Sequence, residues 1–82
     1  MSPEKKVDIK RLQKEALGKL WKLYEYNKAD MARALDVSPQ TVNGWFKRGR
    51  ISATVAITAE AATYGIITKE ELRPDVSEWF GA

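Results

Sequence analysis

The chain has 82 residues, a net charge of +3 and no cysteine or histidine. That length suits a single small domain spanning residues 1–82, and the composition excludes disulfides, the usual zinc ligands and the commonest general base, so we expect neither catalysis nor a metal, cofactor or small-molecule substrate. Because the sequence has neither an apolar run of about 18 residues nor a secretory leader, it predicts no membrane contact and a location in the bacterial cytoplasm.

A long first helix is predicted from Asp8 to about Glu25, after a frayed segment at residues 1–6. Asp8 is the expected N-cap, and Val7 and Leu12 are placed to form a hydrophobic staple around it. The basic residues of this helix lie off the centre of its apolar stripe and form either a solvated face or a flank that touches phosphate. The stripe predicted to face the core comprises Ile9, Leu12, Ala16, Leu20 and Leu23, broadened by Leu17 and Tyr24.

Residues 27–49 predict two short helices joined by a tight turn, the spacing of a helix-turn-helix DNA-binding unit. Asn27 should cap the first of these helices, with Asp30 reaching back in the manner of a capping box. Asp36 occupies the turn position where glycine usually supplies a positive φ, at a cost of about 1 kcal/mol. The inner face of this helix comprises Met31, Ala32 and Leu35.

The second helix of the unit should begin with Ser38 as N-cap and Pro39 at the first helical position, and should end at Gly49. A helical wheel divides it into two opposite arcs. The arc predicted to be buried comprises Val42, Trp45 and Phe46. The opposite arc, with Thr41 at its rim, comprises Gln40, Asn43, Gly44 and Lys47.

This opposite arc is the predicted base-reading face. Glutamine and asparagine amides can pair with adenine N6 and N7, and a lysine can donate to guanine O6 and N7. The competing interpretation is a polar helix face that is merely solvated. Four constraints of size and polarity met together favour the DNA-binding interpretation, at Ala32, Val37, Val42 and Trp45.

The charge distribution agrees with a polyanionic partner for the first part of the chain. Residues 1–50 hold 12 Lys or Arg against 6 Asp or Glu, whereas the remaining 32 residues hold 2 against 5. The predicted helix-turn-helix lies in the positive part. The residues expected to contact DNA phosphate are Asn27, Lys28, Ser38, Arg48 and Arg50.

A fourth helix is predicted over residues 53–64, capped by Ser52 and closed by Gly65. It has two apolar faces, of which one can enter the core while the other needs a partner or the tail of the chain. The first face comprises Val55, Ala56, Ala59 and Ala62. The second comprises Ile57, Ala61 and Tyr64.

Thr68 and Glu71 predict a capping box that opens a single helical turn ending at Leu72. Residues 73–82 then form a C-terminal tail with two large aromatic residues near its end. Such a tail is usually disordered unless it is tied down, so it should either fold back onto the fourth helix or contact a second subunit.

Three segments within residues 27–76 look familiar, and they are ADMARALDVSPQTVNGWFKRGRIS, ATYG and ITKEELRPDV. In these segments the chain resembles the Cro-type repressors and the related Cro/YdaS-like helix-turn-helix proteins of phages and prophages. The resemblance implies a lambda-repressor-like fold, a compact helical bundle that sometimes carries a C-terminal hairpin. Because the C-terminal segment of this chain lacks two alternating β runs, we predict the all-α version, with about five helices. It also implies repression through a palindromic operator bound by a dimer. The chain departs from the usual family pattern at Asp36 and Ser52, where glycine and proline are common. The base-reading residues carried over by position are Gln40, Thr41, Asn43, Gly44 and Lys47.

The sequence therefore predicts a homodimeric, sequence-specific repressor that binds double-stranded DNA through the major groove. The alternative is an antitoxin-like protein-interaction module that neutralises a partner and also regulates its own promoter. The aromatic tail and the two-faced fourth helix favour that alternative. Activation of transcription through contact with polymerase is a third possibility that the sequence does not distinguish.

Overall fold

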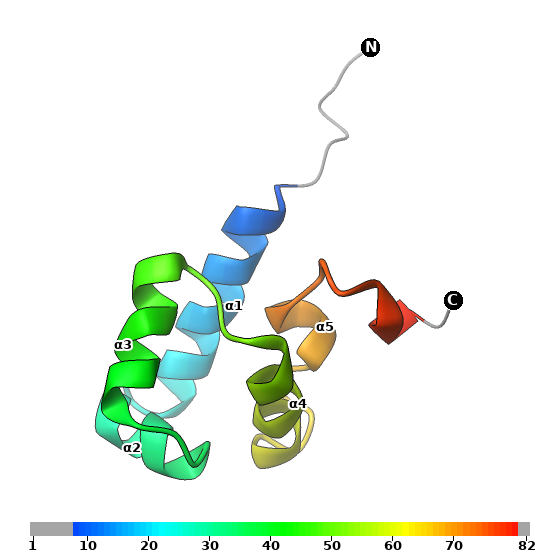
Figure 1. Ribbon diagram of the computed structural model, residues 1–82. Helices are drawn as coiled ribbons and strands as arrows, with labels where there is room; N and C mark the ends of the chain where they lie inside the picture. The colour runs from blue at the N-terminus through cyan, green and yellow to red at the C-terminus, as the bar shows by residue number, and fades with distance from the viewer. Residues whose placement is uncertain (1–7, 81–82) are drawn as a thin grey trace.

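The computed structural model describes residues 8–80, which form five α-helices and one short 3-10 helix (Figure 1). The elements are α1 (Ile9–Leu23), α2 (Lys28–Ala34), α3 (Pro39–Arg48), α4 (Ala53–Ala62), α5 (Lys69–Leu72) and η2 (Ser77–Phe80). Since residues 8–80 contain no β-strand, the predicted all-α fold is confirmed. Over the same residues, no helix has both the length and the apolar character needed to span a membrane.

The start of α1 is as predicted, but its end is not. Asp8 caps the helix by accepting a hydrogen bond from the N–H of Arg11 at 3.2 Å. Glu25 has a φ of 55° in a Schellman arrangement of backbone hydrogen bonds, which ends the helix at Leu23 instead of Glu25. The predicted frayed segment and the Val7 half of the staple fall in residues 1–7, outside the described part of the chain.

The buried face of α1 is rotated relative to the predicted stripe. Leu23 was expected in the core but is 44% exposed, because it lies in the last turn beside a surface hollow that it shares with Ile66. Ile9 and Leu12 are only partly buried. The residues that α1 buries are Gln13, Ala16, Leu17 and Leu20.

Asn27 caps α2, with its side-chain oxygen 3.0 Å from the N–H of Asp30. The reciprocal half of the predicted capping box is wrong. The N–H of Asn27 already donates to the carbonyl of Tyr24 at 2.9 Å, and the Asp30 carboxylate instead pairs with Arg33 at 2.7 Å.

The turn between α2 and α3 is a Schellman motif with Asp36 in the left-handed position, at a φ of 58°. The N–H of Val37 donates to the carbonyl of Ala32 at 2.9 Å, and that of Asp36 donates to Arg33. Ser38 then caps α3 by accepting from the N–H of Thr41 at 3.1 Å. The sharp turn thus fixes the angle between the two helices.

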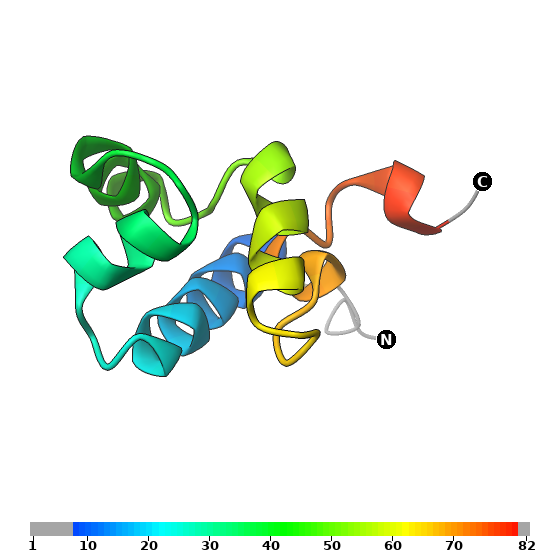
Figure 2. The ribbon, with the colours of Figure 1, turned by 90° about the horizontal axis from the view of Figure 1, so that it is seen from below.

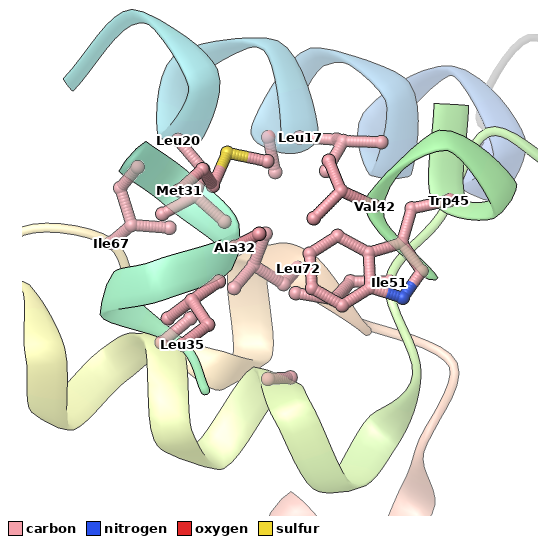
Figure 3. Close-up of a cluster of buried hydrophobic side chains, with 13 residues drawn as sticks. Leu17, Leu20, Met31, Ala32, Leu35, Val42, Trp45, Ile51, Ile67 and Leu72 are labelled. Carbon is pink, nitrogen blue, oxygen red and sulfur yellow. The ribbon is translucent and has the colours of Figure 1, made fainter. Parts of the chain in front are cut away.

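All five α-helices contribute to one hydrophobic core, seen in part in Figure 3. Met31 and Ala32 of α2 face Val42 and Trp45 of α3, and Leu17 and Leu20 of α1 close the core from the other side. Four of these side chains, Leu20, Met31, Val42 and Trp45, have no exposed surface. The helix-turn-helix is therefore held rigidly by the rest of the bundle.

The α4 helix buries one face and exposes the other. Ala56 and Ala59 are fully buried, whereas Ile57 is 50% and Tyr64 is 94% exposed. The helix ends at Ala62, earlier than predicted, because Tyr64 adopts a left-handed φ of 56° in another Schellman arrangement. Within residues 8–80, nothing covers the exposed face.

The C-terminal segment is tied to the bundle by a group of hydrogen bonds that we call the clasp, formed by Gln13, Ile51, Arg73 and Asp75. Arg73 makes two 2.8 Å bonds to the Asp75 carboxylate and one to the carbonyl of Ile51. Gln13 donates to the same carboxylate at 2.9 Å. The hydrogen bonds from Arg73 hold the pKa of Asp75 at about 2, below its ordinary 3.8.

Beyond the clasp, η2 lies at the opposite end of the molecule from α3 (Figure 2). The predicted capping box of Thr68 and Glu71 is confirmed at the start of α5. Lys69 of α5 places its ammonium 5.4 Å from the centre of the Trp79 ring. The tail thus contacts α5 and leaves the Tyr64 side of α4 open.

Candidate nucleic-acid interface

The α3 helix turns one face into the core and the opposite face to solvent. Val42 and Trp45 are fully buried, as predicted, while Phe46 is only partly buried. Gly44 is half-buried in the middle of the outer face. The other outer residues are all exposed, and they are Gln40, Thr41, Asn43 and Lys47. We call these four residues together with Gly44 the recognition face.

Ser38 and Thr41 form hydrogen bonds with each other at the N-terminus of α3. The hydroxyls of Ser38 and Thr41 lie 2.9 Å apart, and the Ser38 oxygen also accepts from the Thr41 N–H. The Thr41 hydroxyl is thereby held at the rim, beside the backbone N–H groups that begin the helix. Such a helix start favours contact with an anion.

Arg48 lies against the middle of the recognition face. A Cβ atom added to Gly44 would lie 3.1 Å from one terminal nitrogen of the Arg48 guanidinium. The two residues are one helical turn apart, so the absence of a side chain at Gly44 leaves space for the guanidinium to fold back along the helix. The sequence assigned Arg48 to phosphate contact, and the structure places its charge next to the predicted base-reading residues.

An aromatic cluster supports the junction of α1, α2 and α3. The Trp21 ring packs edge-on against both Tyr26 and Phe46, with ring centres 5.1 Å apart in each pair. The ammonium of Lys28 lies 4.6 Å from the centre of the Phe46 ring and 5.4 Å from that of Trp21. These cation–π contacts fix Lys28 beside Asn27 at the start of α2.

The C-terminal end of α3 lies beside the N-terminal half of α1 (Figure 1). Gly49 closes α3 with a φ of 81°, and the Lys14 side chain packs so closely on it that an added Cβ would lie 3.1 Å from the Lys14 Cγ. Arg50 follows, exposed to solvent. The sequence placed Lys14 among the basic residues beside the apolar stripe, on a solvated face or a phosphate-touching flank, but it did not predict the contact with Gly49, since that contact depends on how α1 and α3 pack.

The cations around α3 lack acidic partners within the described part of the chain. The ion pairs that residues 8–80 form involve Arg11, Lys19, Arg33, Lys69 and Arg73. None of the predicted phosphate-contact cations, Lys28, Arg48 and Arg50, forms one, and neither does Lys47. Nor do residues 8–80 contain a cluster of acidic side chains able to hold a metal ion.

The chain matches the model of a protein family described as "Bacterial toxin YdaS" over residues 27–79, from the N-cap of α2 to η2. It belongs to the YdaS family. The matched residues include the whole helix-turn-helix, α4 and the clasp residues Ile51, Arg73 and Asp75, while all of α1 lies outside the match. The resemblance seen in the sequence is thereby confirmed for the YdaS-like proteins.

Among curated proteins, a relative named "Putative transcriptional regulator YdaS" from Escherichia coli K12 is 48% identical over 50 residues. The alignment covers 60% of this chain and 50% of the relative, so the chain spans about half the length of that YdaS protein. No solved structure matches the chain.

Proposed function

We propose that the chain is a sequence-specific DNA-binding transcriptional repressor of Cro type that acts as a homodimer on a palindromic operator. The observation that carries the proposal is the orientation of α3, with Trp45 fully buried and Asn43 and Lys47 exposed on a rigid scaffold. Membership of the YdaS family and the name of the Escherichia coli relative support a role in transcription.

In this proposal α3 lies in the major groove. Gln40 and Asn43 pair with adenine edges, Lys47 donates to guanine, Thr41 contacts a phosphate or a thymine methyl, and Gly44 allows close approach. The phosphate contacts come from the start, the turn and the end of the helix-turn-helix, and they comprise Asn27, Lys28, Ser38, Arg48 and Arg50. Occupancy of a promoter then excludes polymerase, which requires no catalysis.

Two subunits are required because one small domain contacts few base pairs. Recognition helices about 34 Å apart would enter successive major grooves, giving a two-fold-symmetric site of about 12–20 base pairs. If each subunit neutralises about three phosphates, the logarithm of affinity should fall with the logarithm of salt concentration at a slope near −5.

The test is selection of bound duplexes from a random DNA pool by the purified chain. We expect an enriched motif with two-fold symmetry and a spacing near one helical turn, together with the salt dependence above. An enriched set without a common motif, or binding that is independent of salt, would contradict the proposal.

A second candidate function, contact with a protein partner in an antitoxin-like role, is favoured by one specific observation. Tyr64 is 94% exposed in a left-handed conformation that costs a tyrosine more than a glycine, and Ile66 and Ile57 beside it are 66% and 50% exposed. Replacing Tyr64 and Ile66 by serine should abolish capture of such a partner. DNA binding should survive the change, whereas equal loss of both properties would argue against separate surfaces.

A further inference from the structure

A cleft of about 260 Å³ lies between the first half of α1 and the C-terminal end of α3. Its walls carry Lys10 and Lys14 from α1, and Lys47 and Arg48 from α3. The remaining lining residues are Gln13, Phe46 and Gly49, so no carboxylate of residues 8–80 borders the cleft. The space is several times the roughly 30 Å³ that one water molecule occupies.

The four cations of the cleft are free of ion pairs among residues 8–80. Two carboxylates border a neighbouring hollow on α1, but both are engaged with Arg11. Asp8 accepts its backbone N–H at 3.2 Å, and Glu15 pairs with its guanidinium at 3.7 Å. Neither carboxylate forms an ion pair with a cation of the cleft.

Interaction with a helix dipole accounts for the positions of two of the four cations of the cleft but not for the other two. Lys47 and Arg48 lie in the last turn of α3, where cations interact favourably with the helix dipole. Lys10, by contrast, lies in the first turn of α1, where the N-cap Asp8 supplies one negative charge but the turn itself contains no acidic residue, and Lys14 follows one turn later. Cations near a helix N-terminus are unfavourable in the isolated protein, and an anion bound between the helices would relieve that repulsion.

The geometry also positions Lys14. The Lys14 side chain packs with its Cγ and Cδ on Gly49, the residue that closes α3. Gln13 between the two lysines is fixed by its hydrogen bond to Asp75 in the clasp. The cleft is thus a built feature joining α1 to the end of the recognition helix.

We propose that this cleft binds a backbone phosphate of the duplex, with Lys10 and Lys14 as ligands in addition to Arg48. The proposal rests on the proposed function, and it extends the DNA-binding surface from the helix-turn-helix to α1. The phosphate it binds lies on the strand that passes the C-terminal end of α3, at the edge of each half-site.

The test compares the variants K10Q and K14Q with the control K22Q, using the duplex selected from the random pool. Glutamine keeps the carbon atoms of Lys14 that pack on Gly49. Lys22 is exposed on α1, does not line the cleft, and its replacement changes the net charge equally. We expect K10Q and K14Q to weaken binding to selected and random duplexes by the same factor, and to make the salt slope shallower by about 1 per subunit. K22Q should keep the parent slope.

A second measurement locates the phosphate by replacing each one in turn with an uncharged methylphosphonate. One position should weaken the parent protein by a larger factor than it weakens K10Q or K14Q, because each variant has lost one of the three cationic ligands of that phosphate. Affinities of these variants equal to that of K22Q, or methylphosphonate profiles equal to that of the parent, would overturn the cleft proposal while leaving the proposed function intact. Failure of the parent itself to select a duplex would instead overturn the proposed function.

Discussion

At the residue scale, specificity is predicted to depend on the exposed amides of α3. Asn43→Ala or Gln40→Ala should each cost about 1–3 kcal/mol of binding free energy on the selected duplex and relax its base preference, because each removes a bidentate pair with a base. Titration of selected and single-substituted duplexes measures both effects. Since the two side chains are exposed, thermal unfolding should be unchanged. An equal loss on every duplex would point to phosphate contact instead.

Gly44 allows a prediction in which stability and binding move in opposite directions. Gly44→Ala should stabilise α3 by up to about 1 kcal/mol, since glycine is a poor residue inside a helix. The new methyl group would lie 3.1 Å from a terminal nitrogen of the Arg48 guanidinium, which must therefore shift away from residue 44 by a few tenths of an ångström. We therefore expect a higher melting temperature together with weaker DNA binding. Parallel melting and binding measurements test this, and unchanged affinity would show that the position of Arg48 is unimportant.

At the scale of the elements, the helix-turn-helix contains strain that can be relieved. Asp36 has a φ of 58°, and its side chain makes no hydrogen bond among the residues described. Asp36→Gly should stabilise the fold by about 1 kcal/mol, because glycine adopts this conformation without steric cost. Urea unfolding measures the change, and a decrease in stability would mean that the aspartate has a favourable role not visible in its contacts.

The sequence predicted these elements well where local chemistry determines them. The caps at Asp8, Asn27, Ser38 and Thr68 depend on short-range hydrogen bonds, and all four are present. The prediction was wrong where distant packing decides. Leu23 has the spacing of a core residue but lies past the region that the other helices cover. Gln13 is polar yet buried, and its side-chain amide donates a hydrogen bond to Asp75, which lies 62 residues away in the sequence.

In the candidate interface, too, the sequence predicted what one helix determines and did not predict what depends on packing between helices. A helical wheel identified the recognition face because Trp45 and Val42 define the buried side of α3 within one helix. It could not show that Arg48 folds back over Gly44, nor that Lys10 and Lys14 approach the end of α3. Those positions depend on side-chain conformation and on the packing of helices far apart in the sequence.

At the scale of the whole molecule, the clasp makes stability depend on pH. Asp75 has a pKa of about 2 in the folded protein and an ordinary value of 3.8. Because the pKa is lowered by folding, the stabilisation is fully present above about pH 4 and is lost as the pH falls toward 2. Hydrogen bonding to Lys19 also lowers the pKa of Glu71, which acts in the same direction.

Asp75→Asn should therefore lower the free energy of unfolding at neutral pH and reduce its dependence on pH between 2 and 4. Urea titrations of both proteins across that range test the prediction, and the two stability curves should converge at the acidic end. Identical pH profiles would show that the ion pair with Arg73 contributes nothing.

The burial of Trp45 also provides an optical probe of the recognition helix. Of the three indoles in the chain, only this one is completely shielded from solvent, and it packs directly beneath the surface predicted to touch DNA. With Trp21 and Trp79 replaced by phenylalanine, tryptophan fluorescence would come from this one site. A blue emission maximum that shifts red only on denaturation would report the docking of α3 on the bundle.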